Sequence, residues 1–373
     1  MASTTQNAGF IRSGDPLQMG REPVYFGRNI VAQINSGFEL QHRLFVNDPW
    51  ELIAEAIQRA LPSSRNRNIA QSFRRQAEDY FRAATTGREL AVRPVLLYYA
   101  FLNLSKAYAV ARGNTIVAGK VQHGISAEPK PRAITGSLIK FPKPGLFQEL
   151  LKHLDGDAGV LASDLRLGHL LPQILPGHRL WCYATKRTER FLSVDRFEVR
   201  HSARTKQVWL NIYIDKGNLE RLGISEKRVL IEAVFDKDFD VVSPSLAEDS
   251  VCLQQRVPET YNQDPAEALA AIIGNVKNRI WETVKVASPY RKPYIYCCPR
   301  TEQRARLPQM LSIYLLMFFF GSVTRYSPLY FEDLLESKFG PLFDTFISES
   351  PLQFLYLMAS DILGREVSKP AII

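Results

Sequence analysis

The sequence has few cysteines, and their arrangement argues against two kinds of stabilised fold. The four are Cys182, Cys252, Cys297 and Cys298. None belongs to a C-x-x-C pair, and two adjacent cysteines cannot easily bind one metal ion together. The pattern therefore argues against a disulfide scaffold and against a zinc site. Reduced thiols in a cytoplasmic protein are expected instead.

The sequence also lacks an apolar segment of membrane-spanning length. The most apolar run, residues 310–323, has 14 residues and contains Ser312, whereas spanning a bilayer takes about 20. Residues 1–20 contain no apolar core of a secretory signal. We therefore expect a cytoplasmic protein without a membrane partner, in which residues 310–323 form a buried helix.

Several common catalytic motifs are missing as well. The sequence contains no G-x-x-x-x-G-K-[ST] phosphate loop, no G-x-G-x-x-G after a predicted strand, no G-x-S-x-G and no H-E-x-x-H. Its six histidines show no metal-ligand spacing. Nucleotide hydrolysis, zinc-dependent hydrolysis and serine acyl transfer are disfavoured, and neither a metal nor a cofactor is expected.

What the sequence does contain is typical of a folded, basic protein. Apolar residues make up 46% and charged residues 23% of the 373 positions, as in ordinary globular domains. A chain of this length usually has two or three domains. Lysine and arginine outnumber aspartate and glutamate by 47 to 38, and this balance favours an acidic partner such as nucleic acid.

The order of predicted elements indicates an α+β fold with a mainly helical body and a strand-rich insertion. We expect a flexible N-terminal arm (1–47), a helical region (48–175), the strand-rich insertion (176–299) and a C-terminal helical region (300–373) that packs on the first. Helical periodicity or length predicts helices at 49–61, 68–85, 93–111, 144–154, 162–175, 264–287, 307–339 and 341–364. Short β-branched and aromatic runs predict strands at 178–186, 190–202, 207–215, 228–236 and 293–299.

The helix predicted from residue 93 carries a polar stripe on an otherwise apolar surface. At 100° per residue, Tyr99, Asn103 and Lys106 fall within about 60° of one another. Buried polar groups need partners. Asn103 and Lys106 therefore either bond to neighbouring helices or reach solvent, or they form a polar binding site.

Two segments resemble a known family. Residues 98–124 run Tyr-Tyr-Ala, Asn-Leu-Ser-Lys-Ala, Gly and His-Gly, and residues 307–335 form an apolar helix leading into Arg325, Tyr326 and Pro328. This order resembles the YaaC-like family of bacterial proteins, and the resemblance extends over most of residues 48–366. It implies a fold rather than a particular reaction.

Residues 93–124 also resemble one helix pair of HEPN domains, small helical modules common in bacterial toxin and phage-defence systems. Many of these are ribonucleases whose arginine and histidine are separated by four to six residues. Arg112 and His123 are separated by ten, so a catalytic role needs the loop between them to fold back on the helix. His123 before Gly124 equally fits a turn or a helix cap. The resemblance also suggests a homodimer.

A basic run precedes this helix. Between Arg59 and Arg93 there are eight arginines against three acidic residues. Guanidinium groups suit bidentate phosphate contacts, so either a phosphate-binding patch or a solvated helix face is expected. The candidates for phosphate binding are Arg67, Arg74, Arg75 and Arg82.

Another basic residue, Arg325, follows the predicted apolar helix of residues 310–323. Arg325 is expected at the C-terminal end of that helix, where a positive charge is favoured, with Tyr326 and Pro328 in the turn to the next helix. The alternative is a binding role together with Lys106.

Two functions follow from these patterns. The first is a non-catalytic binding or assembly protein that uses a basic helical surface to engage RNA, another nucleic acid or a protein partner in bacterial stress or phage defence. The second is a divergent, metal-independent HEPN-like endoribonuclease that uses His123 with Arg112 or Lys106.

Overall fold

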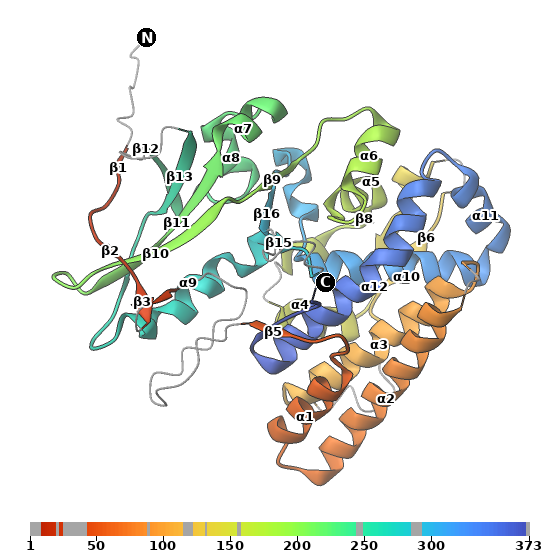
Figure 1. The fold of residues 1–373 in the computed structure, drawn as a ribbon. Coiled ribbons are helices and arrows are strands. Elements are labelled where there is room, and N and C mark those ends of the chain that lie inside the picture. Colours follow the sequence, from red (N-terminus) through yellow and green to blue (C-terminus); the bar gives the residue numbers. More distant parts are fainter. Residues whose placement is uncertain are drawn as a thin grey trace. The chain divides into compact units, whose positions relative to one another are not determined.

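The computed structural model describes residues 9–19, 22–24, 43–87, 90–114, 122–130, 133–154, 158–243, 249–284 and 293–370. Contacts divide the chain into two units (Figure 1). The sheet unit consists of Met1–Arg43, Arg190–Glu282 and Lys292–Thr301, and the helical unit of Leu44–Glu189, Thr283–Arg291 and Glu302–Ile373. The fold is α+β and mainly helical, as predicted.

The helical unit contains most of the long helices. Its α-helices are α1 (Trp50–Ala60), α2 (Ser64–Thr86), α3 (Arg93–Ala111), α4 (Leu146–His153), α5 (Leu167–Leu170), α6 (His178–Thr185), α10 (Gln309–Tyr326), α11 (Pro328–Glu336) and α12 (Gly340–Leu363). Short 3₁₀ turns are η2 (Ile134–Gly136), η3 (Ala158–Ala162) and η4 (Leu171–Gln173), and η7 (Arg300–Ala305) runs across the unit boundary.

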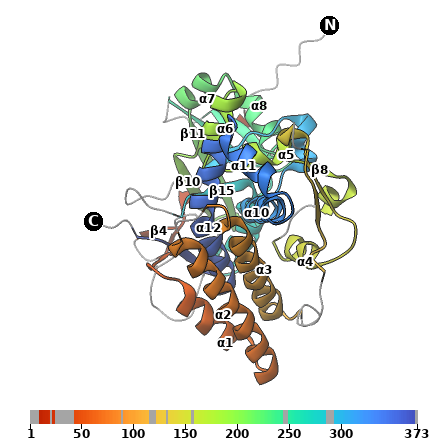
Figure 2. The same cartoon turned by 90° about the vertical axis from the view of Figure 1, so that its right-hand side faces the viewer.

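Helix α3 is the centre of this unit. It contacts α2, α10, α12 and α4, which explains why its side chains are apolar on nearly every face. The C-terminal helical region packs on the N-terminal one, as predicted, through α10 and α3: the ring centre of Tyr98 lies 5.3 Å from that of Phe318 and 6.0 Å from that of Tyr314. Figure 2 shows α10 nearly end-on, next to α3. The C-terminal helices therefore complete the core that the N-terminal helices begin.

Two small sheets complete the helical unit. Strands β6 (Ser126–Glu128), β7 (Leu138–Lys140) and β8 (Leu165–Arg166) form an antiparallel sheet. Strands β5 (Arg43–Phe45) and β17 (Glu366–Ser368) form a separate two-stranded sheet.

The sheet unit is built on a sheet whose main order is β1-β12-β13-β11-β10-β2, with β14 added beside β11. Its strands are β1 (Gly9–Phe10), β2 (Asp15–Pro16), β10 (Arg196–Ser202), β11 (Gln207–Asp215), β12 (Phe239–Ser243), β13 (Ser250–Gln255) and β14 (Glu259–Thr260). The other elements are β3 (Gln18–Met19), β4 (Glu22–Pro23), β9 (Phe191–Ser193), β15 (Ile280–Glu282), β16 (Pro293–Tyr296), α7 (Lys216–Leu222), α8 (Glu226–Glu232), α9 (Leu269–Val276), η5 (Pro265–Ala268) and η6 (Lys277–Arg279).

Strand β11 is buried on both faces. Its residues Val208, Leu210 and Ile212 pack with apolar residues of α7, α8 and α9, while Tyr213 faces a second small cluster with Val242. The predicted strand at 207–215 is confirmed at the same bounds.

Two predicted strands are wrong. Residues 178–185 form helix α6, which begins after Gly177 (φ 113°) and is followed by Lys186 in a left-handed conformation. Residues 228–236 fall mostly in helix α8, whose Ser225 hydroxyl caps the backbone N–H of Arg228. β-branched and aromatic content misled both predictions because tertiary packing and end caps decide between helix and strand in short segments.

Two predicted helices are only partly helical. The segment 264–287 contains α9 and then strand β15, and the segment 162–175 divides into β8, α5 and η4. Within the expected N-terminal arm, β1 pairs with β12 and β2 with β10. Among the described residues, no helix combines the length and apolar character needed to cross a bilayer.

Candidate functional site

Close packing of α3 against α10 brings the predicted polar residues of both helices together. Gly321 of α10 lies against α3, where a Cβ atom would be 3.1 Å from both the carbonyl oxygen of Pro94 and Cβ of Tyr98. A glycine permits this approach of backbone to backbone. Helix α10 ends at Tyr326 and α11 begins at Pro328, which confirms the predicted turn and leaves Arg325 in the last turn of α10.

The end of α10 forms an aromatic–basic cluster with α2 and α3, which we define as Tyr80, Tyr99, Arg325 and Tyr326. Arg325 Nη1 donates a hydrogen bond to the Tyr99 hydroxyl at 2.7 Å. The guanidinium carbon also lies 6.0 Å from the Tyr99 ring centre and 4.4 Å from that of Tyr326. Tyr80 stacks on Tyr99 at 5.5 Å. The structure thus places an arginine beside two tyrosine rings, with a hydrogen bond to one of their hydroxyls.

This cluster is open to solvent. Tyr326 is 72% exposed and Tyr80 is 36% exposed, and Arg325 is exposed. Within the part of the chain that the structure describes, no carboxylate lies within ion-pair distance of Arg325. Its positive charge is therefore available to an external anion.

Lys106 lies further along α3 in a more enclosed place. Its ammonium group lies 5.1 Å from the ring centre of Phe73, a favourable cation–π distance. Partial burial lowers the pKa of Lys106. Asn103, between Tyr99 and Lys106 on the predicted stripe, is only 6% exposed.

The loop that carries His123 is held by backbone hydrogen bonds to the start of α4. The N-terminal N–H groups of α4 are satisfied by this loop: Leu146 N donates to the Gln122 carbonyl at 3.0 Å and Phe147 N to the His123 carbonyl at 3.2 Å. Gly124 has a φ of 77°, a conformation that favours glycine. The loop therefore serves as the cap of α4, which was one of the predicted roles of the His-Gly pair.

The imidazole of His123 lies beside α3 and α10. Its Nδ1 is 2.5 Å from the hydroxyl of Tyr98. Burial lowers the pKa of His123, and the positive charges of Lys106 and Arg325 lower it further. Burial raises the pKa of Tyr98, so the phenol keeps its proton. A neutral imidazole and two cations thus meet at one site.

The predicted pairing of Arg112 with His123 is not observed. Instead, Arg112 Nη2 donates to the carbonyl oxygen of Asp361 in α12 at 2.7 Å. Its guanidinium carbon also lies 5.3 Å from the ring centre of Tyr108. Arg112 follows the end of α3 and joins that helix to α12, whereas the cations that act on His123 are Lys106 and Arg325.

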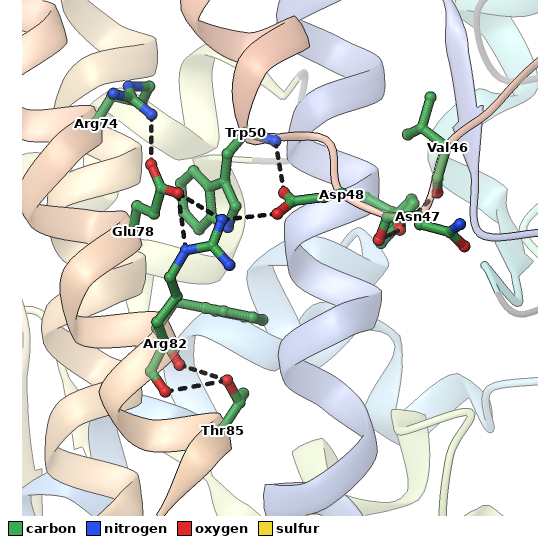
Figure 3. Close-up of polar contacts among 10 residues, drawn as sticks. Val46, Asn47, Asp48, Trp50, Arg74, Glu78, Arg82 and Thr85 are labelled. Carbon is green, nitrogen blue, oxygen red and sulfur yellow. Dashed lines mark hydrogen bonds and ion pairs between the residues drawn. The ribbon is translucent and has the colours of Figure 1, made fainter.

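Two of the four arginines proposed for phosphate binding are engaged with carboxylates (Figure 3). Arg74 Nη1 donates to Glu78 at 2.5 Å, and its side chain is only 10% exposed. Arg82 bridges Glu78 and Asp48, with Nη2 2.6 Å and 2.7 Å from their oxygens. These ion pairs join α2 to the start of α1, since Asp48 also accepts from Trp50 N.

The other two arginines proposed for phosphate binding, Arg67 and Arg75, are not engaged with carboxylates of the described residues. Arg75 is exposed and Arg67 is half-buried. Neither forms an ion pair within the described residues. Among the four, Arg67 and Arg75 thus remain available to phosphate.

Three residues of the site were not among the predicted site residues. Tyr98 bonds to His123, Tyr80 stacks on Tyr99, and Phe73 lies under Lys106. Phe73 and Tyr80 recur along α2 at helical spacing, a pattern that is typical of core residues. The adjacent pair Tyr98-Tyr99 was a usable signal, since two neighbouring residues of a helix point about 100° apart and can face two partners.

The family model described as YaaC-like Protein matches residues 36–362. Neither the curated proteins nor the solved structures gave a match. Among the described residues, no three His, Cys, Asp or Glu side chains gather closely enough to hold a metal ion.

Proposed function

The chain belongs to the YaaC-like protein family, whose name specifies no reaction, and we propose from the site that it binds single-stranded nucleic acid, RNA in the first place. The observation that carries the proposal is the guanidinium of Arg325. It is exposed, has no carboxylate partner among the described residues, and lies within 6.0 Å of the ring centres of Tyr99 and Tyr326.

The chemistry of this cluster suits a flexible, unpaired strand. Bases stack on exposed aromatic rings, each worth about 1–3 kcal/mol, and cations neutralise the phosphates between them. Tyr326 offers an exposed face, and the hydrogen bond to Tyr99 fixes the guanidinium of Arg325 in advance. Lys106 and the imidazole of His123 extend the same site along α3. A role in bacterial stress or phage defence remains a prediction of the sequence.

The protonation of His123 is also compatible with binding. When Tyr98 donates its hydroxyl proton to Nδ1, the proton of the neutral imidazole lies on Nε2. That N–H group can then donate to a phosphate oxygen. In this tautomer His123 is a ligand for phosphate and has no free nitrogen to act as a base.

Fluorescence anisotropy with a labelled single-stranded RNA of about 20 nucleotides tests the proposal. We expect Arg325→Ala and Tyr326→Ala each to raise Kd about tenfold at low salt. Arg59→Ala is the matched control, because Arg59 is an exposed arginine already paired with Glu55. Equal affinities for the wild type, Arg325→Ala and Tyr326→Ala would refute the proposed surface.

A second function, metal-independent RNA cleavage, is favoured by one specific observation. The pKa of His123 is lowered by burial and by two nearby cations, which keeps the imidazole available as a base at neutral pH. If Nδ1 donates to the Tyr98 oxygen instead, Nε2 can accept a proton from a 2′-hydroxyl while Lys106 and Arg325 stabilise the phosphate charge.

Incubating the purified protein with labelled RNA in the presence of EDTA separates the two functions. Cleavage that is lost in His123→Ala supports the second function, and retention of cleavage in Arg112→Ala would agree with the observed position of Arg112. RNA that is bound but stays intact excludes cleavage and leaves binding as the function.

A further inference from the structure

A second site in the helical unit has the size and lining of a small-molecule pocket. The cavity has a volume of about 690 Å³ and lies between the segment 133–135, helices α5 and α6, and the segment 330–339 of α11 and its following turn. Small-molecule sites in proteins are typically about 300–1,000 Å³. The cavity is therefore large enough to hold a metabolite such as a phosphorylated sugar.

The walls of this cavity are fixed by close packing. A Cβ atom at Gly168 would be 2.9 Å from the carbonyl oxygen of Thr135, so only glycine fits at this contact. The rings of Trp181 and Phe339 stack at 5.6 Å. The Tyr330 hydroxyl donates to the carbonyl oxygen of Lys130 at 3.2 Å. A pocket whose walls are already packed loses little entropy when it binds a ligand.

The charges that line the cavity favour an anion. Arg187 and Glu302 lie 3.9 Å apart and largely compensate each other. Arg166 and Lys338 also line the cavity, are exposed, and make no ion pair within the described part of the chain. They outnumber Asp333, the remaining carboxylate of the lining. The lining thus contains two cations and one carboxylate that make no ion pair among the described residues, and the Lys338 ammonium lies 5.1 Å from the ring centre of Phe339.

The polar groups of the lining also fit hydroxyl-bearing ligands. Thr135, Thr185 and Ser337 contribute hydroxyl groups, and Asp333 contributes a carboxylate. Carboxylates commonly accept hydrogen bonds from the hydroxyls of a ribose. Guanidinium and ammonium groups bind phosphate through charge-assisted hydrogen bonds.

We propose that this cavity binds a phosphorylated sugar, with the phosphate on Arg166 and Lys338 and the sugar hydroxyls on Asp333. The site is separate in its residues from the aromatic–basic cluster, and neither proposal depends on the other. The shared chemistry could come from a free sugar phosphate or from a mononucleotide, which also carries a planar base.

Isothermal titration calorimetry of the full chain tests the proposal with four probes: ribose 5-phosphate, adenosine 5′-monophosphate, adenosine and inorganic phosphate. We expect ribose 5-phosphate and adenosine 5′-monophosphate to bind. Adenosine should bind at least about tenfold more weakly than adenosine 5′-monophosphate. Tighter binding of the monophosphate than of ribose 5-phosphate identifies a nucleotide as the ligand, and equal binding identifies a sugar phosphate. Adenosine binding as tightly as its monophosphate overturns the proposal, as does the absence of heat with both phosphorylated probes at millimolar concentration.

Substitutions in the lining test which residues bind the phosphate and which bind the sugar. Arg166→Ala and Lys338→Ala should each raise the Kd of the phosphorylated probes about tenfold or more. Asp333→Asn should weaken the sugar-containing probes while leaving inorganic phosphate unchanged. Lys227→Ala is the matched control, because it removes one exposed positive charge from α8 of the sheet unit. Unchanged affinity in Arg166→Ala and Lys338→Ala, with the thermal stability of the wild type, would contradict the assignment.

Discussion

At the residue scale, His123 shows how a folded environment sets the charge of a side chain. Burial disfavours the imidazolium, and Lys106 and Arg325 repel it. The Tyr98 hydroxyl fixes the orientation of the ring through Nδ1. A histidine in this position is neutral at physiological pH, so it contributes a hydrogen-bonding group to the site rather than a third positive charge.

A pH titration of His123 by NMR tests this description. We expect a midpoint below 6.5, the ordinary value for histidine, and an upward shift of that midpoint in Lys106→Ala because one repelling charge is removed. Lys227→Ala should leave it unchanged. Since the unfolded chain binds this proton more readily, the free energy of unfolding should fall as pH decreases from about 6.5 toward the folded pKa and then level off. A midpoint above 6.5 would contradict the argument.

The ion pairs of α2 lead to a prediction about stability. Glu78 is 17% exposed in its side chain and pairs with both Arg74 and Arg82. Glu78→Gln should therefore lower the free energy of unfolding by about 2 kcal/mol, because a buried guanidinium loses its partner. The matched variant Glu55→Gln removes an exposed pair with Arg59 and should cost less than about 0.5 kcal/mol. Urea unfolding followed by circular dichroism measures both, and equal losses would contradict the difference in burial.

Some of the site's residues could be predicted from the sequence and others could not. Tyr99 and Lys106 were predicted because they lie on a polar stripe of an apolar helix, and Arg325 because it follows an apolar run at the expected end of a helix. The pairs of Arg74 and Arg82 with Glu78 could have been predicted, because these residues are four apart on one helix. The bond from Arg82 to Asp48 was not predictable, since Asp48 lies 34 residues earlier in the chain. The loop that brings His123 to Tyr98 was equally hidden, because backbone caps of α4 determine its path.

At the element scale, the contact between α3 and α10 determines whether the site forms. Tyr98, Tyr99 and Lys106 come from α3, whereas Arg325 and Tyr326 come from the end of α10. Gly321 sets the distance between these helices. Any side chain that pushes them apart should therefore disturb both the core and the site.

Gly321→Leu tests this contact. The added side chain has no space beside Pro94 and Tyr98, and it should lower the free energy of unfolding by about 1–3 kcal/mol through overpacking. Gly274→Ala is the comparison, since Gly274 of α9 has no atom within 4 Å of an added Cβ. That change should stabilise the protein by about 0.5–1 kcal/mol. Calorimetric melting measures both variants, and a stabilising Gly321→Leu would show that the helices are not in contact as described.

Long helices were predictable where their apolar pattern was strong. Helices α3, α10 and α12 have 19, 18 and 24 residues. Their side chains are apolar on most faces because each helix is surrounded by other elements. The errors at α6 and α8 fall on helices of 8 and 7 residues. In such short segments the end caps and the neighbours outweigh the intrinsic preferences of the side chains.

At the scale of the whole molecule, net charge indicated an acidic partner but not where it binds. The arginine-rich stretch from Arg59 to Arg93 includes Arg59, Arg74 and Arg82, which are paired with Glu55, Glu78 and Asp48. Its formal excess of positive charge therefore overstates what a ligand meets. The cations of the candidate site, Arg325 and Lys106, make no ion pair among the described residues and lie outside this stretch.

The salt dependence of RNA binding follows from this distribution. A single strand loses about 0.7 of a logarithmic unit of affinity per logarithmic unit of salt for each neutralised phosphate. Contacts through Arg325 and Lys106 therefore predict a slope of about −1.4 for the wild type and about −0.7 for Arg325→Ala. Anisotropy titrations over a range of salt concentrations give these slopes. A slope several times steeper, unchanged in Arg325→Ala, would indicate a broad arginine surface instead.

The most direct test of the central claim is to locate bound RNA on the protein. Ultraviolet cross-linking of the full chain to RNA that contains 4-thiouridine, followed by mass spectrometry of the peptides, identifies the residues in contact with bases. We predict cross-links at Tyr326 and Tyr80, with their loss in Arg325→Ala. Cross-links confined to other parts of the chain, or a pattern unaffected by Arg325→Ala, would contradict the account.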